Sequence, residues 1–429
     1  MAMKSDRSAK RFIRFYTPDS LGGLYFLLAL LFVLLTGFNY PCRAQDYAIT
    51  VSAGGFDRVE SMVSATFPKP VAPGVYQLKD ASDNTILMQV NGHNRGWFIV
   101  DKLPAGTSKT YTFSPETSAT SAKNTGITYD FDQNTVTFQK EEDSVFSYYY
   151  RSNNPPEELG PIYKRAGYIH PLFSPNEVPL TNHLDLKMHS HHYGIWAAWP
   201  HTEFQGRTPD FWNIQDGSAR VEHVDSLQKI WQGPVYGGLK AKNHYVDLSS
   251  SAPVIALNEE WVTRVYNTSP INGREYNILD LKLTHTTNTA QPLKLPEYRY
   301  GGLAFRGHQQ WDNPENVSFL TSKGYNRNNG NKTRARWVHI GGTVNGKLVG
   351  VAILGHPDNF RAPQPVRINP ETPYMVFAPM QLGDMVIKPG SPYVMRYRFV
   401  TYDGKPDVER LNQLWNDYAY PVGVTVLKK

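Results

Sequence analysis

The sequence predicts a mostly β protein: a small β domain at residues 45–118, a large antiparallel β-sandwich at 119–429 and one helix near the C-terminus. Most of the chain after residue 45 alternates apolar with polar or small residues, as half-buried strands do. Only 407–419 shows persuasive helical spacing of apolar residues. The Ser/Thr-rich stretch 114–125 has few large apolar residues and marks the expected domain boundary.

Residues 1–44 predict a secretory signal peptide. Five basic residues between positions 4 and 14 precede the apolar run 24–38, and Ala44 supplies the small residue at the expected cut before Gln45. The alternative is an uncleaved N-terminal anchor, because the apolar run is long for a signal. Cleavage would give a periplasmic or secreted protein with no membrane span.

The charge and the cysteine content exclude several classes of protein. The formal net charge of the chain is +6, but most of it lies in the first 44 residues, and no basic stripe follows. Nucleic acid is therefore not an expected partner. Cys42 is the single cysteine, so the processed chain would contain no disulfide, thiolate metal ligand or cysteine nucleophile.

Individual elements follow from local patterns. Asn345-Gly346 lies between two apolar runs and predicts a hairpin with a type I′ turn. Residues 103–113 predict a turn that leads into an edge strand. Strands are also expected in three runs within 126–152, and at 393–402, where Tyr393, Met395, Tyr397 and Phe399 would share one face.

The strongest candidate site is the stretch HSHHYGIWAAWPH at 189–201. If 188–199 is a strand, His189 and His191 share one face while His192 points to the other. The pair suits acid–base chemistry. It could instead hold a divalent metal with a third ligand from His170, His183, His201, His223 or Glu203. Packing is the remaining interpretation.

Aromatic and charged residues near this stretch suggest a sugar site. Trp196 and Trp199 would point to opposite faces, so only one could stack on a sugar ring. The segment 295–311 combines a carboxylate, guanidinium groups and an indole, which suits a polyhydroxylated or acidic sugar, although an internal Glu–Arg ion pair is equally compatible. Its candidates are Glu297, Arg299, Arg306, His308 and Trp311; Asp210 could orient a histidine or cap a turn, and Arg361 is a further candidate.

Eight motifs in this order resemble the secreted bacterial family named PmoA: GYIHPLFSPNEVPLT, HSHHYGIWAAW, DFWN, LNEEW, EYRYGGLAFRG, TRARW, HPDNFRAPQPVRI and LWNDYA. The resemblance covers about residues 47–427. The name refers to a methane monooxygenase subunit with several membrane spans, whereas this chain has one apolar run. We therefore do not take the name as the function.

The resemblance implies a galactose-mutarotase-type supersandwich in which histidines and a glutamate line a sugar cleft. It places His189, His191 and His192 on one side and Glu297 on the other. Tyr193 stands where the family usually has arginine, so a contact made by that arginine is not expected here.

Together these patterns predict an exported carbohydrate-active protein. The leading expectation is an enzyme that uses His189, His191 and Glu297 as acid–base groups in epimerisation, elimination (lyase or dehydratase chemistry) or glycoside cleavage. Substrate contacts are expected from His192, Trp196, Trp199, Arg299, Arg306, His308, Trp311 and Arg361. The sugar or oligosaccharide is the expected partner and no cofactor is required, although a divalent metal at His189 and His191 stays open. The alternatives are a non-catalytic glycan-binding protein and a metal-dependent hydrolase or oxygenase.

Overall fold

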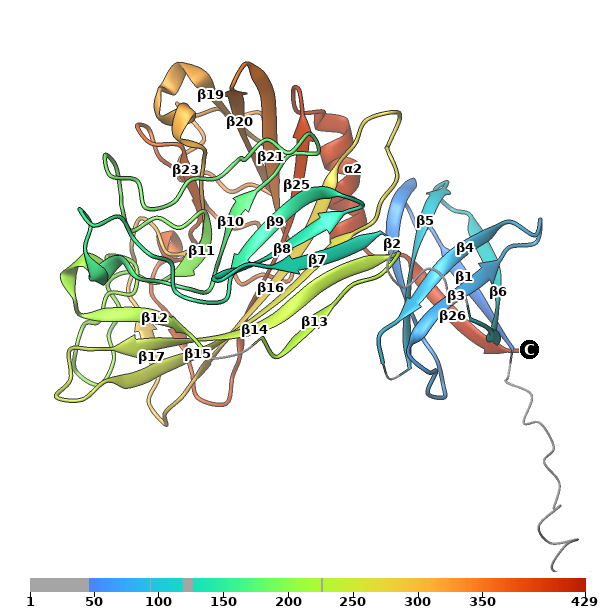
Figure 1. Cartoon of the computed structure of the whole chain (residues 1–429), viewed down its shortest axis with the longest axis horizontal. Coiled ribbons are helices and arrows are strands. Elements are labelled where there is room, and N and C mark those ends of the chain that lie inside the picture. The colour runs from blue at the N-terminus through green and yellow to red at the C-terminus, as the bar shows by residue number, and fades with distance from the viewer. Residues whose placement is uncertain (1–45, 93, 119–125, 225–226) are drawn as a thin grey trace, which may run out of the picture. The chain divides into compact units, whose positions relative to one another are not determined.

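The chain folds into antiparallel β-sheets, as its alternating sequence predicts (Figure 1). The computed structural model describes residues 46–92, 94–118, 126–224 and 227–429. The predicted signal peptide, residues 1–44, lies outside the described residues. Within the described ranges, we find no helix with the length and apolarity that crossing a bilayer requires.

The N-terminal residues form a seven-stranded sheet in the order β2-β5-β4-β3-β6-β1-β26. Its strands are β1 (Tyr47–Ser52), β2 (Arg58–Thr66), β3 (Gly74–Lys79), β4 (Thr85–Val90), β5 (Arg95–Leu103), β6 (Ser108–Ser118) and β26 (Gly423–Lys428). The expected edge strand after residue 103 is instead internal, because β6 pairs with β1 on one side and β3 on the other. The last strand of the sheet, β26, comes from the C-terminus and pairs with β1. The predicted N-terminal domain, residues 45–118, does not include this strand.

Two larger sheets form the sandwich. The first has the order β22-β23-β18-β11-β10-β9-β8-β7. Its strands are β7 (Ile127–Phe131), β8 (Thr135–Lys140), β9 (Asp143–Tyr149), β10 (Tyr168–Leu172), β11 (Ile195–Ala198), β18 (Gly302–Arg306), β22 (Val366–Ile368) and β23 (Tyr374–Phe377). The three strands expected within 126–152 are confirmed as β7, β8 and β9.

The second large sheet has the order β12-β14-β15-β16-β25-β21-β20-β19, with β13 paired to β14. Its strands are β12 (Ala219–His223), β13 (Lys229–Trp231), β14 (Tyr236–Asp247), β15 (Val254–Tyr266), β16 (Asn277–Thr287), β19 (Val317–Thr321), β20 (Trp337–Val344), β21 (Lys347–Gly355) and β25 (Tyr393–Asp403). The pair β17 (Leu293–Leu295) and β24 (Met385–Ile387) forms a separate ribbon. Short 3-10 helices lie at Pro161–Tyr163, Ile214–Asp216, Gln309–Asp312, Pro314–Asn316 and Pro379–Leu382.

The main core lies between the two large sheets. It combines Ile195 and Phe305 of the first sheet with Trp261, Leu281 and Phe399 of the second, all buried. The alternation in β25 is confirmed: Met395, Tyr397 and Phe399 enter this core, whereas Arg398 on the opposite face pairs with Asp280. The mostly β sandwich predicted from the sequence is therefore confirmed.

Two local predictions near the C-terminus are also confirmed. β20 and β21 are joined by Asn345 (φ 49) and Gly346 (φ 79), both in the left-handed region that a type I′ turn requires. Helix α2 (Val408–Ala419) begins after Asp407, whose carboxylate accepts a hydrogen bond from the amide of Arg410 at 2.9 Å.

The outer face of the first large sheet carries a second aromatic layer. Tyr168, Tyr193, Trp196, Trp212 and Tyr300 are buried together there, away from the main core. Trp196 contacts this layer whereas Trp199 enters the main core, so the two indoles do lie on opposite faces. The candidate site is built on this outer layer.

Candidate functional site

The stretch 188–194 is a turn and not the expected strand. β11 begins only at Ile195. His189 has a φ of 55° and Gly194 a φ of 65°, and the amide of His192 donates to the carbonyl of His189 at 2.9 Å. Two left-handed residues and a local hydrogen bond are incompatible with strand alternation. The strand expected at 188–194 is therefore wrong, and His192 is the buried member of the three histidines, at 1% exposure.

A buried ion-pair cluster holds this turn. The Arg306 guanidinium contacts Asp185 at 2.9 Å and Asp312 at 2.7 Å, and its side chain is fully buried. Asp185 in turn accepts from the amide of Lys187 at 2.8 Å, and its carbonyl accepts from the Ser190 hydroxyl at 2.8 Å. Burial raises the pKa of Asp185, but the Lys187 amide and the Arg306 guanidinium together hold it below its ordinary value. Arg306 thus braces the segment that leads into the histidines.

The three imidazoles meet at one place. The rings of His189 and His192 stack with centroids 4.7 Å apart, and His191 stands nearly perpendicular to His192 at 4.8 Å. The His192 ring also packs against the rings of Trp196 and Tyr374, with centroid distances of 4.8 and 4.7 Å. Because the turn replaces the strand, the three imidazoles pack against one another beside one cavity.

Burial keeps these histidines uncharged near neutral pH. It lowers the pKa of His191 to about 4, with the His189 imidazole adding to the effect. Burial also lowers the pKa of His192 well below its ordinary range. For His189, burial and then the Arg306 guanidinium lower the pKa, against the opposing fields of Asp185 and Glu371. Neutral imidazoles can accept a proton, as a general base must.

The histidines line a cavity of about 400 Å³. Two guanidinium groups, from Arg299 and Arg367, and one carboxylate, from Glu371, lie in the same wall. Four further side chains offer hydrogen bonds or ring faces: Asn213, Tyr300, Asn369 and Tyr374. The Nδ1 atom of His192 is buried and has no hydrogen-bond partner among the described residues, so it remains available to a ligand.

Glu297 does not lie in this cavity. It lines a neighbouring cavity of about 580 Å³ together with His201, Glu203 and Asp216. The carboxylate that accompanies the histidines is Glu371, which sequence reasoning did not identify. Its only sequence signal is its place two residues after Asn369 in a Pro-rich turn, which is not specific.

The predicted stacking tryptophans are packed inside the protein. Trp196, Trp199 and Trp311 are each fully buried. The indole nitrogen of Trp199 donates to His285 at 3.1 Å. None of the three lines the histidine cavity, where the aromatic lining comes from Trp212, Tyr300 and Tyr374 instead.

Three polar candidates support the fold at other places. The His308 side chain accepts from the amide of Gln310 at the start of a 3-10 helix. Arg361 donates to the carbonyls of Pro379 and Gly383, both at 2.7 Å. Asp210 caps a turn by accepting from the amide of Trp212 at 2.9 Å. Of the two interpretations given for Asp210, turn capping is the one that these contacts support.

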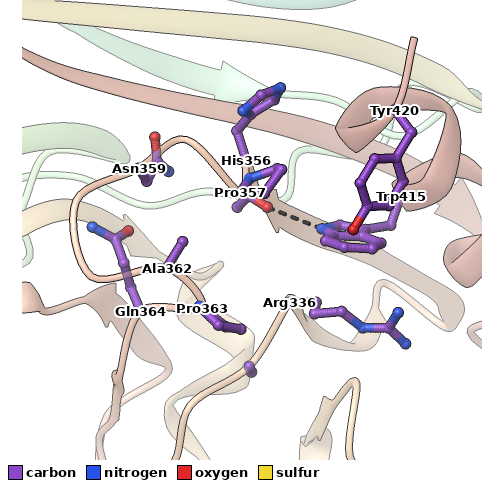
Figure 2. Close-up of a pocket in the computed structure, with 11 residues that line it drawn as sticks. Arg336, His356, Pro357, Asn359, Ala362, Pro363, Gln364, Trp415 and Tyr420 are labelled. Atoms are coloured by element: carbon purple, nitrogen blue, oxygen red, sulfur yellow. Dashed lines mark hydrogen bonds between the residues drawn. The ribbon is translucent and has the colours of Figure 1, made fainter. Parts of the chain in front are cut away.

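A further cavity, of about 160 Å³, lies beside α2 (Figure 2). Its wall includes Arg336, His356 and Trp415, and the Trp415 indole donates to the Gly355 carbonyl at 2.9 Å. The Arg336 guanidinium lies over the Trp415 ring at 4.6 Å and donates to Asn412 at 3.1 Å. These polar groups already serve the packing of the loop against the helix.

The metal alternative needs a third protein ligand beside His189 and His191. In the ranges that the structure describes, no three His, Cys, Asp or Glu side chains are grouped so that they could hold a metal ion. His170 and His183 form a separate pair with ring centroids 3.9 Å apart. A metal at His189 and His191 stays a prediction.

The chain is distantly similar to three solved structures. A glycosyl hydrolase family 38 protein from Enterococcus faecalis is 10% identical, with a TM-score of 0.38 over 94% of this chain and 50% of that chain. An alpha-mannosidase from Enterococcus faecalis V583 is 9% identical, with a TM-score of 0.39 over 94% and 48%. Heparan sulfate lyase HepC from Pedobacter heparinus is 11% identical, with a TM-score of 0.32 over 66% and 36%.

This chain thus spans half or less of the length of those proteins, and similarities at this level carry no argument about activity. No curated protein matches the sequence. The resemblance to the family named PmoA stays a prediction. A family model does match residues 135–416, which include the histidine turn, Arg299, Arg367 and Glu371. The chain therefore belongs to the family of unknown function DUF6807.

Proposed function

We propose that this protein is a carbohydrate-active enzyme that uses the histidine cavity for acid–base chemistry on a sugar. One observation carries the proposal: three imidazoles with lowered pKa values share a cavity wall with two guanidinium groups and a carboxylate. Perturbed titratable groups that converge in one cavity are typical of catalytic sites.

The cavity suits a sugar in size and in chemistry. Its volume of about 400 Å³ lies in the range of small-molecule sites. The amides of Asn213 and Asn369 and the hydroxyl of Tyr374 can exchange hydrogen bonds with sugar hydroxyls. The faces of Trp212 and Tyr300 supply the apolar contact that sugar rings also need.

The electrostatic surroundings of the histidines suggest which one accepts a proton and which one carries it. His191 can accept a proton, because its pKa of about 4 keeps it neutral at pH 7. His189 is the more suitable proton carrier, because Asp185 and Glu371 both favour its protonated form. His192 lies behind both and offers its unpartnered Nδ1 to the substrate or to a neighbouring ring.

Glu371 provides the sharpest test against the glutamate predicted from the sequence. We expect Glu371→Gln to lower turnover on the order of 10²-fold, because it removes the one carboxylate among the residues that line the histidine cavity. Glu297→Gln is the matched control, since it neutralises a carboxylate in the neighbouring cavity. The measurement is turnover of a panel of neutral, keto- and uronic oligosaccharides, with and without a chelator.

The same panel separates the alternatives. A glycan-binding protein would bind an oligosaccharide and leave it unchanged. A metal-dependent enzyme would lose turnover in the chelator. Activity that falls in Glu297→Gln and not in Glu371→Gln would contradict the proposed site.

We also propose that the enzyme acts outside the cytoplasm, in the periplasm or as a secreted protein. The support is the basic, apolar and small-residue pattern of residues 1–44. N-terminal sequencing of the exported protein is expected to begin near Gln45. Recovery of the uncut N-terminus in the membrane fraction would favour the anchor instead.

A further inference from the structure

The two arginines of the histidine cavity are not neutralised by the protein. Arg299 lies between the rings of Tyr298 and Tyr300, at 5.7 and 5.4 Å, and is exposed. The Nε of Arg367 on β22 is buried and has no hydrogen-bond partner among the described residues. Neither guanidinium forms an ion pair within the described chain, in contrast to Arg306, which contacts two carboxylates.

The charge balance of the cavity favours an anionic ligand. With the three imidazoles neutral, Arg299 and Arg367 outweigh Glu371, the one carboxylate in the wall. A guanidinium group binds a carboxylate through two parallel N–H donors, which gives orientation as well as affinity. A sugar that carries one carboxylate would satisfy both the spare charge and the unpartnered donor of Arg367.

We propose that the cavity binds a uronic acid unit through Arg299 and Arg367, and that the histidines then catalyse β-elimination at that unit. This inference rests on the proposed function of the same cavity. It adds the substrate class and the bond that breaks.

The step balances without a co-reactant. His191 takes the proton from C5, next to the carboxylate. The C5–H electron pair forms the C4=C5 double bond, and the bond between C4 and the linking oxygen breaks with its electron pair. The proton passes through His189, whose ring centroid lies 5.8 Å from that of His191, to the departing oxygen. The products are an unsaturated uronate and a free hydroxyl.

The arginines supply what this chemistry needs most. A proton beside an ionised carboxylate is hard to remove, because the resulting anion places a second negative charge on the same group. Fixed cationic donors at that carboxylate stabilise the developing charge in the transition state. This stabilisation makes the C5 proton more acidic, which a weakly basic imidazole such as that of His191 requires.

The probes are 4-linked oligomers of galacturonate, glucuronate, mannuronate and guluronate, each compared with its carboxyl-reduced twin. The readout is the ultraviolet absorbance of the conjugated double bond. We expect the wild-type protein to form unsaturated product from at least one uronate and from none of the reduced twins. Arg299→Gln and Arg367→Gln should each lower kcat/KM on the order of 10- to 100-fold, as expected for a lost charge-assisted hydrogen bond.

Two further variants keep this test decisive. Arg220→Gln is the matched control, because Arg220 is exposed on β12 and pairs with Glu222 outside the cavity. Arg367→Lys keeps the charge but not the paired donors, and we expect activity between wild type and Arg367→Gln. Thermal unfolding of each variant separates a binding defect from a folding defect.

Equal cleavage of an acidic oligomer and its reduced twin would overturn this inference and leave the proposed function in place. Cleavage without a double bond, or exchange at C5 without cleavage, would do the same. If wild type neither binds nor converts any sugar, acidic or neutral, both the inference and the proposed function fail.

Discussion

At the scale of single residues, Arg306 shows how a polar side chain in a suggestive motif can serve the fold. The sequence indicates a ligand contact, and Arg306→Ala would then weaken binding without loss of stability. The structure instead buries Arg306 against Asp185 and Asp312. Asp312 is 6 residues from Arg306 in the sequence, but Asp185 is 121 residues away. No local sequence pattern shows that Asp185 and Arg306 meet in the folded protein.

We therefore expect Arg306→Ala to destabilise the protein by about 3–5 kcal/mol, because it leaves the buried carboxylate of Asp185 and the partly buried carboxylate of Asp312 without their partner. Turnover should fall as well, since Asp185 orders the turn before the histidines. Urea unfolding measures the first effect. Arg299→Ala, an exposed arginine of the same motif, should change stability by about 0.5 kcal/mol or less. Equal stability of both variants would contradict the bracing role.

Of the residues that line the histidine cavity, only some were among the candidates named from the sequence. The histidines 189, 191 and 192, together with Arg299, do share one cavity. Arg367, Glu371 and Tyr374 join them from a segment about 180 residues away, and the short run VRINPETPY that holds them has no chemical signature of its own. Glu297 was the more conspicuous carboxylate, but the chain path places it in the next cavity.

At the scale of elements, the sequence predicted regular strands and turns that require particular residues, such as Asn-Gly, but it did not predict irregular turns. The hairpin at Asn345-Gly346 and helix α2 follow from local rules. The histidine turn breaks the expected strand because Gly194 turns the chain at the entrance of β11. Residues 188–194 read MHSHHYG, in which Gly194 is the one local sign of that break.

Gly194 gives the prediction at this scale. Its φ is +65°, and a Cβ placed there would overlap the carbonyl oxygen of Ile169 on the neighbouring strand. Gly206 has a similar φ of +76° but open space around it. We expect Gly206→Ala to cost about 1 kcal/mol from backbone strain alone. Gly194→Ala should cost about 1–3 kcal/mol more from steric overlap, measured by chemical unfolding. Equal costs would contradict the close packing of the turn against β10.

At the scale of the whole molecule, features that join distant segments were beyond sequence reasoning. β26, from the C-terminus, pairs with β1 as the last strand of the seven-stranded sheet. In the main core, Glu259 contacts His285 at 2.8 Å and Asn243 at 2.8 Å, and Tyr245 donates to the same carboxylate at 3.1 Å. Because Trp199 donates to the other His285 nitrogen, His285 must donate to Glu259. The sequence marks Glu259 only as part of LNEEW and does not reveal its partners.

Buried histidines should make the folded protein sensitive to mild acid. Burial lowers the pKa of His183 and His191 to about 4 and that of His339 to about 3, from an ordinary value of 6.5. Between pH 6.5 and about 4 the unfolded chain therefore binds protons that the folded chain does not. The stability that these groups contribute is complete above pH 6.5 and is lost as pH falls through that window.

We expect the free energy of unfolding to fall by about 2 kcal/mol for each such histidine between pH 7 and pH 5. Burial raises the pKa of Glu60 and of Asp417, so these carboxyl groups bind protons more readily in the folded chain than in the unfolded chain. They therefore offset part of this loss. Urea unfolding at the two pH values measures the balance. Stability that stays constant or rises on acidification would show that the histidines are not buried as neutral groups.

The central claim is that neutral histidines of one cavity catalyse proton transfer on a sugar, and the rates of His189→Ala and His191→Ala test it most directly. On the oligosaccharide that the wild type converts, each substitution should lower kcat by about 10²–10⁴-fold while circular dichroism and thermal unfolding stay close to wild type. His244→Ala, on β14 and outside the cavity, should retain full activity. Wild-type rates in both cavity variants would contradict the claim and leave the histidines as packing groups.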